Sequence, residues 1–241
     1  MKRLALAATI GLFLTSGAQA ALVDRGGGLL YDTVLHVTWL QDANYAKTSG
    51  YSNTGLMTWE QATTWAANLV FHDTANGLDY SGWRLATNSP VNGVWDNNFS
   101  YNGSTDLGYN ITSPNSELSY MYYVNLGLTG AWGPNSNLQP NFGIFGNGNW
   151  GGQNDVGPIR NLQSLAYWSG AGYSPYPATL KWYFDTRLGR TDITYEGVPY
   201  YAWAVRPGDV AAVPEPETYA MMLAGLGLLG LSARRRKANQ H

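Results

Sequence analysis

Three carboxylates in the last third of the chain have the residue type and spacing for glycan cleavage. Asp185, Asp192 and Glu196 lie close together in sequence, between aromatic runs. Hydrolysis of a glycosidic bond needs two carboxyl groups within about 5–10 Å of each other. A solvated hairpin turn explains the same spacing, and we favour that interpretation.

Other catalytic groups are scarce. The histidines are His36, His72 and His241, without partners at ligand spacing, and there is no cysteine. Thiol nucleophiles and cysteine-based zinc sites are therefore excluded. No serine stands in a glycine-flanked nucleophile elbow with a supporting histidine. The sequence predicts a protein that is not an enzyme.

Oxygen-bearing side chains in two polar loops raise the question of calcium. The first loop carries Asp96, Asn98, Asn102 and Asp106, and the second carries Asn154 and Asp155. Calcium takes oxygen ligands of this kind, but the spacing differs from that of the EF-hand loop. Calcium stays open as a weak alternative, and no other metal or cofactor is expected.

Aromatic residues in or beside the loops could stack on sugar rings. They are Tyr101, Tyr109, Trp132, Trp150, Tyr173 and Tyr176. Core packing accounts for about half of such residues in a typical domain. We therefore expect a non-catalytic binding module whose loops contact exopolysaccharide or another surface protein. The alternatives are a structural envelope protein without a specific ligand and, third, a hydrolase built on the carboxylates above.

Short elements must position these loops. Leu29–Asp32 and Val37–Leu40 are apolar runs separated by a turn-length segment, which predicts a hairpin. Thr58 and Gln61 form a capping-box pattern at the start of a helix. Apolar residues then recur at helical spacing, and we expect their tryptophans in the core. This stripe consists of Trp59, Ala62, Trp65, Ala66 and Leu69.

A second helix is predicted over residues 114–126. Ser113 can cap it, Pro114 suits its first position, and Gly127 is a plausible stop. Three aromatic runs at residues 166–169, 182–184 and 200–205 then predict strands. In the last run, large side chains alternate with Ala202 and Ala204, so one face is expected to pack while the other stays thin.

Both ends of the chain carry targeting patterns. Residues 1–20 combine a basic start, an apolar stretch and small residues at Ala18 and Ala20, as in a signal peptide cut by signal peptidase. Near the other end, Val213, Pro214, Glu215 and Pro216 precede an apolar span over 218–233. A basic cluster of Arg234, Arg235, Arg236 and Lys237 follows. This order places the basic residues 234–241 on the cytoplasmic side and the domain outside.

The tail resembles a PEP-CTERM sorting signal in its Pro214-Glu215-Pro216 motif, short glycine-rich span and basic end. The resemblance implies recognition by an exosortase, a membrane protease of Gram-negative bacteria that make exopolysaccharide. It implies an inner-membrane-anchored precursor that is then released to the cell surface or extracellular matrix. A permanent single-span anchor is the alternative.

The predicted helices and strands together indicate one α+β domain over residues 21–208, followed by a linker over 209–217. Charged residues make up only 12% of the chain, and the net charge of −2 excludes the basic surface that nucleic-acid binding requires. Polarity comes instead from asparagine, serine, threonine and glycine in long loops.

Several motifs of this domain are similar to those of the Lcl C-terminal-type family. They are residues 34–42, Trp59 with its helix, Trp83-Arg84-Leu85-Ala86-Thr87, residues 167–169 and Trp203-Ala204-Val205-Arg206. The resemblance implies a C-type lectin-like fold related to formylglycine-generating enzymes, with antiparallel strands, two helices and long polar loops. It implies that both ends of the domain meet in one sheet, and the missing cysteines exclude formylglycine chemistry. We expect Arg84 and Arg206 to be structural.

Overall fold

The computed structural model describes residues 22–210. Within this range, none of the helices has the length and apolar character needed to cross a membrane. Several predicted features lie outside the described residues: the signal peptide with Ala18 and Ala20, the motif Val213 to Pro216, the span over 218–233, and the basic cluster Arg234 to Lys237.

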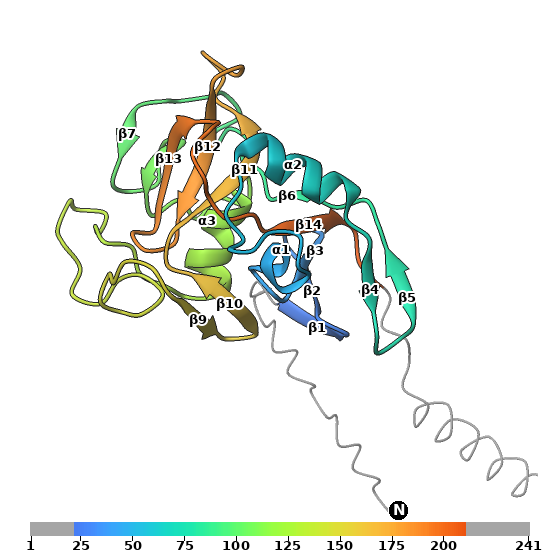
Figure 1. The fold of residues 1–241 in the computed structure, drawn as a ribbon. Coiled ribbons are helices and arrows are strands. Elements are labelled where there is room, and N and C mark those ends of the chain that lie inside the picture. Colours follow the sequence, from blue (N-terminus) through green and yellow to red (C-terminus); the bar gives the residue numbers. More distant parts are fainter. Residues whose placement is uncertain (1–21, 211–241) are drawn as a thin grey trace, which may run out of the picture.

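The first sheet joins the two ends of the domain (Figure 1). Its strands, in spatial order, are β1 (Leu22–Gly26), β2 (Leu29–Asp32), β3 (Val37–Leu40), β14 (Ala204–Pro207) and β6 (Arg84–Leu85). The predicted hairpin of β2 and β3 is confirmed with its bounds. Strand β14 pairs antiparallel with both β3 and β6, so the ends do meet in one sheet.

The second sheet positions the loops. Its strands, in spatial order, are β11 (Ala166–Gly172), β12 (Leu180–Asp185), β13 (Arg190–Tyr195), β8 (Leu107–Tyr109) and β7 (Phe99–Ser100). All neighbours are antiparallel except β7 and β8. Two separate hairpins are β4 (Phe71–Asp73) with β5 (Leu78–Tyr80), and β9 (Gln153–Val156) with β10 (Ile159–Gln163).

The first predicted helix is confirmed as α2 (Trp59–Asn68). The Gln61 N–H donates to Thr58 Oγ1 at 3.3 Å, and the Thr58 N–H donates to Gln61 Oε1 at 3.0 Å, which completes the capping box. Ala62, Trp65 and Ala66 are buried, as the stripe predicts. A short helix, α1 (Tyr45–Thr48), precedes it.

The second helix begins later than predicted. It consists of α3 (Glu117–Tyr120), followed by a π-helical turn, Met121–Asn125. Ser113 and Pro114 do not start it, because the next residues pair with the loop at 88–90: the Ser89 N–H donates to the Asn115 carbonyl at 2.7 Å. Pairing with a distant segment therefore overrides the local helix-start signal of Ser113 and Pro114. At the other end, Gly127 has a positive φ of 61°, as expected for a glycine that ends a helix.

The last predicted strand is also shorter than expected. Tyr200 and Tyr201 each form an isolated bridge, and regular pairing begins only at Ala204. The prediction that only one face of this segment packs is wrong, because Ala202 and Ala204 are as deeply buried as Trp203. The segment passes between packed layers, so small residues are needed on one side and large ones on the other.

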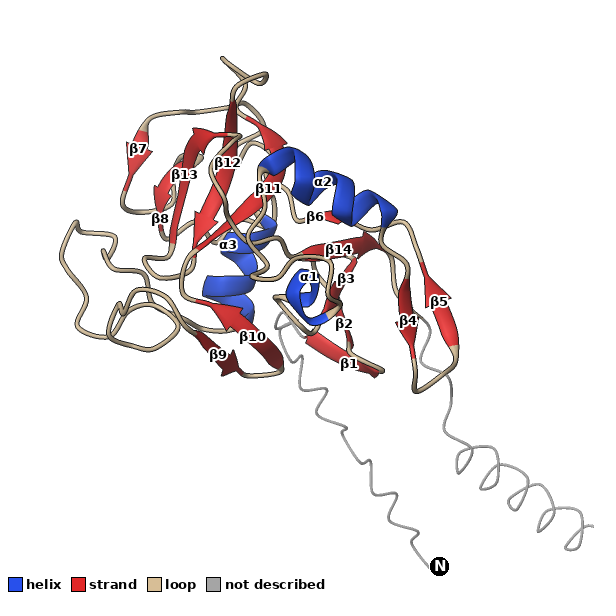
Figure 2. Ribbon diagram, in the orientation of Figure 1, coloured by secondary structure: helices blue, strands red, loops and turns tan. Residues whose placement is uncertain are grey.

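Two hydrophobic clusters form the core, both made of residues between Leu29 and Val210. One cluster packs α2 and Trp168 against the first sheet, and the other packs α3 with Tyr167 and Trp203. Figure 2 shows that strands dominate and that α2 lies along β6 and β11. The fold is α+β in class, with mixed sheets and few helices.

Candidate functional site

Four aromatic rings gather at the β7–β8 edge of the second sheet, and we name them the aromatic loop cluster: Phe99, Tyr101, Tyr109 and Trp132. The rings of Tyr101 and Tyr109 are parallel within 1°, with centroids 5.9 Å apart. The ring centroids of Trp132 and Tyr101 are 5.8 Å apart. Phe99 meets Tyr101 edge to face, with ring centroids 5.1 Å apart. Three of the six aromatic residues predicted to contact glycan are thus brought together.

Local geometry forces this gathering. Asn110, in the left-handed conformation with φ of 58°, donates its side-chain amide to the carbonyls of Tyr101 at 2.6 Å and Trp132 at 2.8 Å. Gly108 permits the close parallel pairing of β7 and β8, since a Cβ there would lie 1.9 Å from the Ser100 carbonyl oxygen. One amide and one glycine therefore fix three separate segments.

The rings of the aromatic loop cluster differ in their exposure to solvent. Tyr109 is only 4% exposed, and this burial raises the pKa of its hydroxyl. Tyr101 and Trp132 are half-buried, whereas Phe99 is 44% exposed. A rigid, partly exposed aromatic platform of this kind supplies contact area at little cost in conformational entropy. Phe99 was not predicted, although it stands only two residues before Tyr101 in the same polar loop.

The other three predicted aromatic contacts lie elsewhere. Trp150 is 71% exposed, with the Arg187 guanidinium 4.7 Å from its ring centre. Tyr173 packs edge-on against Trp182 at 5.5 Å, while Tyr176 is exposed in the hairpin between β11 and β12. Trp95, which the sequence reading missed, stacks on Trp182 at 5.4 Å. These residues do not join the aromatic loop cluster.

The oxygen atoms considered for calcium hold the loops together. Asp106 is buried and accepts the backbone N–H groups of Val91 and Asp96, each at 2.7 Å. Asp96 accepts two bonds from Asn98. The described part of the chain contains no group of three or more histidine, cysteine or acidic residues arranged for a metal ion.

The remaining oxygens of that set also have protein partners. Asn102 accepts the Ser104 N–H at 3.2 Å, and the Asn154 amide donates to the Ile144 carbonyl at 3.0 Å. Asp155 lies on β9, where it accepts the Asn161 N–H at 2.9 Å. These contacts fix the shape of the loops.

The three carboxylates of the hydrolase hypothesis each have a partner in the protein. Asp185 accepts the Arg187 and Leu188 N–H groups in the β12–β13 turn, and burial raises the pKa of its carboxyl. Asp192 forms an ion pair with Arg190, and Glu196 lies 3.4 Å from Lys181. Burial disfavours the charge on Arg190, but Asp192 offsets this, so the pKa of Arg190 is raised.

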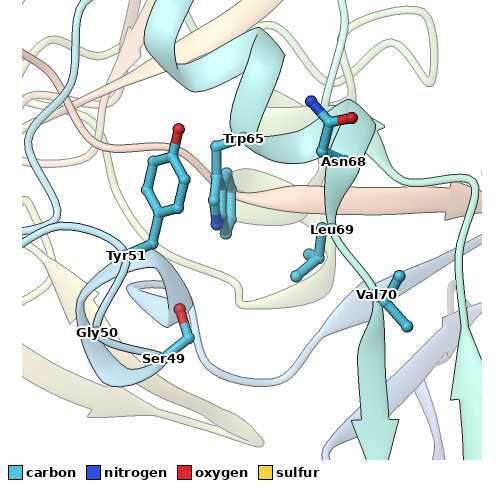
Figure 3. Close-up of a pocket in the computed structure, with 7 residues that line it drawn as sticks. All are labelled: Ser49, Gly50, Tyr51, Trp65, Asn68, Leu69 and Val70. Carbon is cyan, nitrogen blue, oxygen red and sulfur yellow. The ribbon is translucent and has the colours of Figure 1, made fainter.

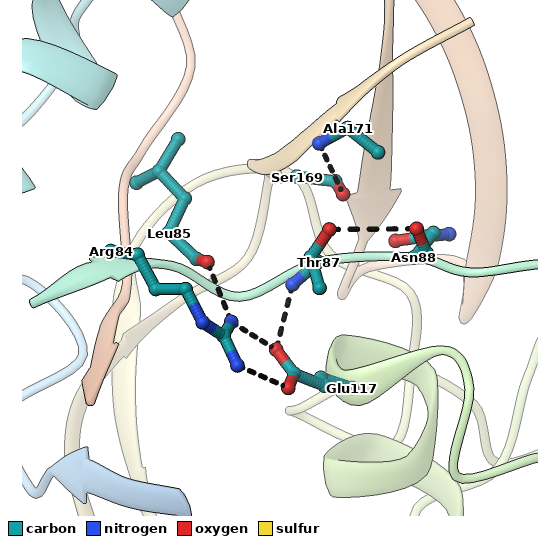
Figure 4. A network of polar contacts seen from close by, with 7 residues as sticks. All are labelled: Arg84, Leu85, Thr87, Asn88, Glu117, Ser169 and Ala171. Atoms are coloured by element: carbon teal, nitrogen blue, oxygen red, sulfur yellow. Dashed lines mark hydrogen bonds and ion pairs between the residues drawn. The ribbon is translucent and has the colours of Figure 1, made fainter. Parts of the chain in front are cut away.

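Arg84 is structural, as predicted. Its guanidinium makes two 2.7 Å bonds to the Glu117 carboxylate and a 3.0 Å bond to the Leu85 carbonyl (Figure 4). Glu117 also accepts the Thr87 N–H at 2.8 Å. This clasp ties β6 to the start of α3 and explains why the helix begins at Glu117. Arg206 lies over the Tyr80 ring at 5.3 Å.

Comparison with known proteins identifies the tail. Residues 212–237 match the model of the PEP-CTERM protein-sorting motif. No curated protein and no solved structure matches the chain. The match covers the predicted motif and the whole basic cluster, and it indicates an exported, membrane-anchored precursor that exosortase processes.

Proposed function

We propose that the protein is a surface or extracellular-matrix component whose domain is a non-catalytic, lectin-like module that binds exopolysaccharide through the aromatic loop cluster. The observation that carries this proposal is the convergence of Tyr101, Tyr109 and Trp132 with Phe99 on one partly exposed platform. Aromatic faces with an apolar body and polar rim are suited to the CH-rich faces of sugar rings.

The sorting motif supplies the setting. An exported precursor processed by exosortase delivers its domain outside the inner membrane, where exopolysaccharide is the abundant partner implied by the family of such tails. The meeting of the domain's ends in one sheet, through β3 and β14, supports the lectin-like assignment of the fold. Release of the domain into the matrix, rather than permanent anchoring, belongs to the same proposal.

The test is a polysaccharide pull-down with the purified exported protein, with and without calcium. The proposal expects retention on the producing organism's exopolysaccharide, without depolymerisation of it. Replacing Tyr101 by Ala should weaken retention about tenfold, or roughly 1.4 kcal/mol. Tyr195→Ala is the matched control, since Tyr195 is 70% exposed at the end of β13 and outside the cluster.

The other outcomes are equally informative. No retention of the wild-type protein under either condition would overturn the binding module and favour a structural envelope protein without a specific ligand. Shortened polysaccharide chains, abolished by Asp192→Asn, would favour the hydrolase. Retention lost only on removal of calcium would favour an ion-dependent site over the aromatic loop cluster.

A further inference from the structure

A hollow of about 320 Å³ lies between the segment after α1 and the C-terminal half of α2 (Figure 3). Its walls come from both segments and from the two residues that join α2 to β4: Ser49, Gly50, Tyr51, Trp65, Asn68, Leu69 and Val70. A volume near 300 Å³ is at the lower end of the range for small-molecule sites.

The indole N–H of Trp65 has no hydrogen-bond partner among the described residues, although the side chain is only 3% exposed. Four other tryptophans donate to backbone carbonyls at 2.8 Å: Trp59, Trp83, Trp168 and Trp203. In Figure 3 the Trp65 nitrogen points into the space bounded by Ser49 and Leu69. Unlike the N–H groups of Trp39 and Trp182, which are fully buried without a partner, the Trp65 N–H keeps contact with solvent, so an acceptor oxygen of a ligand in the hollow can take the place of water there.

Tyr51 lines this hollow and also a second one. Its side chain is 56% exposed, and it lines both the first hollow and a neighbouring hollow of about 350 Å³. The second hollow is completed by Ser52, Leu56, Met57 and Gln61. The two hollows therefore adjoin at Tyr51, and both are lined by residues of α2, Trp65 and Asn68 in the first and Gln61 in the second.

The lining is neutral and rich in hydrogen-bonding groups. None of the residues around either hollow carries a charge. Asn68 uses its amide nitrogen to donate to the Thr64 carbonyl, which leaves its oxygen as an acceptor. Gln61 uses its oxygen in the capping box, which leaves its amide nitrogen as a donor. A hydroxyl-rich, uncharged ligand matches this set, whereas an anionic sugar would find no cation.

We propose that these adjoining hollows form a site for a neutral oligosaccharide, with one sugar unit on each side of Tyr51. The Trp65 N–H donates to a hydroxyl or ring oxygen of the unit in the first hollow, and Tyr51 stacks between the two units. Asn68 and Gln61 supply one acceptor and one donor at opposite ends. This site lies on α2 and its neighbouring loop, so it does not depend on the aromatic loop cluster.

The experiment follows the indole N–H resonances of the full-length protein in detergent by ¹H–¹⁵N NMR. The probes are cellotetraose, maltotetraose and mannotetraose, with tetragalacturonate as the acidic comparison. Trp65→Phe assigns the Trp65 resonance by its disappearance and retains an aromatic ring in the core. The proposal expects at least one neutral probe to shift this resonance, with little effect from tetragalacturonate.

Variants measure the two contacts. In isothermal titration calorimetry, which does not depend on the Trp65 resonance, Tyr51→Ala should weaken binding of the active probe about tenfold. Trp65→Phe should weaken it about fivefold, because these variants remove a stacking ring and a hydrogen bond respectively. Tyr176→Ala, an exposed tyrosine in another loop, should leave affinity unchanged. The fold of each variant is checked by its circular dichroism.

Two results would overturn the site. One is an unshifted Trp65 resonance with every neutral probe at concentrations well above about 1 mM, the weak end of specific binding. The other is a shift that Tyr51→Ala leaves intact. The proposed function fails separately, when Tyr101→Ala leaves exopolysaccharide retention unchanged while the Trp65 resonance still responds to a neutral probe.

Discussion

The aromatic side chains of the first sheet and of the aromatic loop cluster are held in different ways. Trp39 and Trp203 meet edge to face at 4.8 Å with almost no exposed surface, and the Trp203 N–H donates to the Leu40 carbonyl. In the aromatic loop cluster, Tyr101 is stacked on Tyr109 but stays half-buried. The first arrangement buries both rings and uses the Trp203 N–H for the fold, while the buried Trp39 N–H has no partner among the described residues; the second arrangement leaves ring surface available to a partner.

The largest expected effect is on the buried side of this comparison. Trp203→Ala should reduce the free energy of unfolding by about 4 kcal/mol, because it leaves a cavity and an unpaired Leu40 carbonyl. Urea denaturation followed by circular dichroism measures this change. A loss below about 1 kcal/mol would mean that the core collapses around the missing ring and that Trp203 contributes no more to stability than a ring of the aromatic loop cluster.

The Arg84–Glu117 clasp comes next. Glu117→Ala should cost about 3 kcal/mol of unfolding free energy, because Arg84 and the Thr87 N–H lose their shared acceptor. The same denaturation experiment applies, with Glu60→Ala as control, since Glu60 is an exposed acid in the first turn of α2. Equal effects of the two substitutions would contradict a structural role for the clasp.

In the aromatic loop cluster, a substitution should affect binding more than stability. Tyr101→Ala should lower the unfolding free energy by only about 1 kcal/mol, since the ring is half-buried and one stacking contact is lost. Its larger effect should fall on retention by exopolysaccharide. If instead Tyr101→Ala destabilised the protein as much as Trp203→Ala, the cluster would be a second core.

The smallest expected effect concerns pH. Burial raises the pKa of Asp185 above its ordinary value of 3.8, so the folded protein binds this proton more tightly than the unfolded chain. The associated stability is fully present below pH 3.8 and is lost as pH rises through the higher folded pKa. Asp185→Asn keeps an acceptor for the Arg187 N–H and should flatten this part of the stability profile. Denaturation midpoints between about pH 3 and pH 7 provide the measurement.

The sequence carried the parts of the fold that depend on local signals. The capping box of Thr58 and Gln61 locates α2, and two short apolar runs separated by a turn-length segment locate β2 and β3. The start of the second helix was misplaced because the pairing of Ser89 with Asn115 joins segments distant in sequence. Local propensity does not contain such a contact.

The candidate site was predictable only in part, for a related reason. Tyr101, Tyr109 and Trp132 stand out as aromatic residues in polar loops, but their convergence depends on two bonds from Asn110 across the intervening chain. Trp65 was correctly expected in the core from its helical stripe. The apolar stripe predicts that the ring is buried, but it does not predict whether the indole N–H has a hydrogen-bond partner.

The placement of the domain's last strand has a mechanical consequence. Strand β14 lies inside the first sheet, between β3 and β6, and Arg25 on β1 is bonded to Asp209 just beyond it at 2.9 Å. A pull applied to the chain beyond residue 210 is therefore transmitted first to this ion pair and then to an interior strand bonded on both edges. Tension from an anchored tail would be resisted by two ladders at once, which suits a domain that must stay folded while it is tethered.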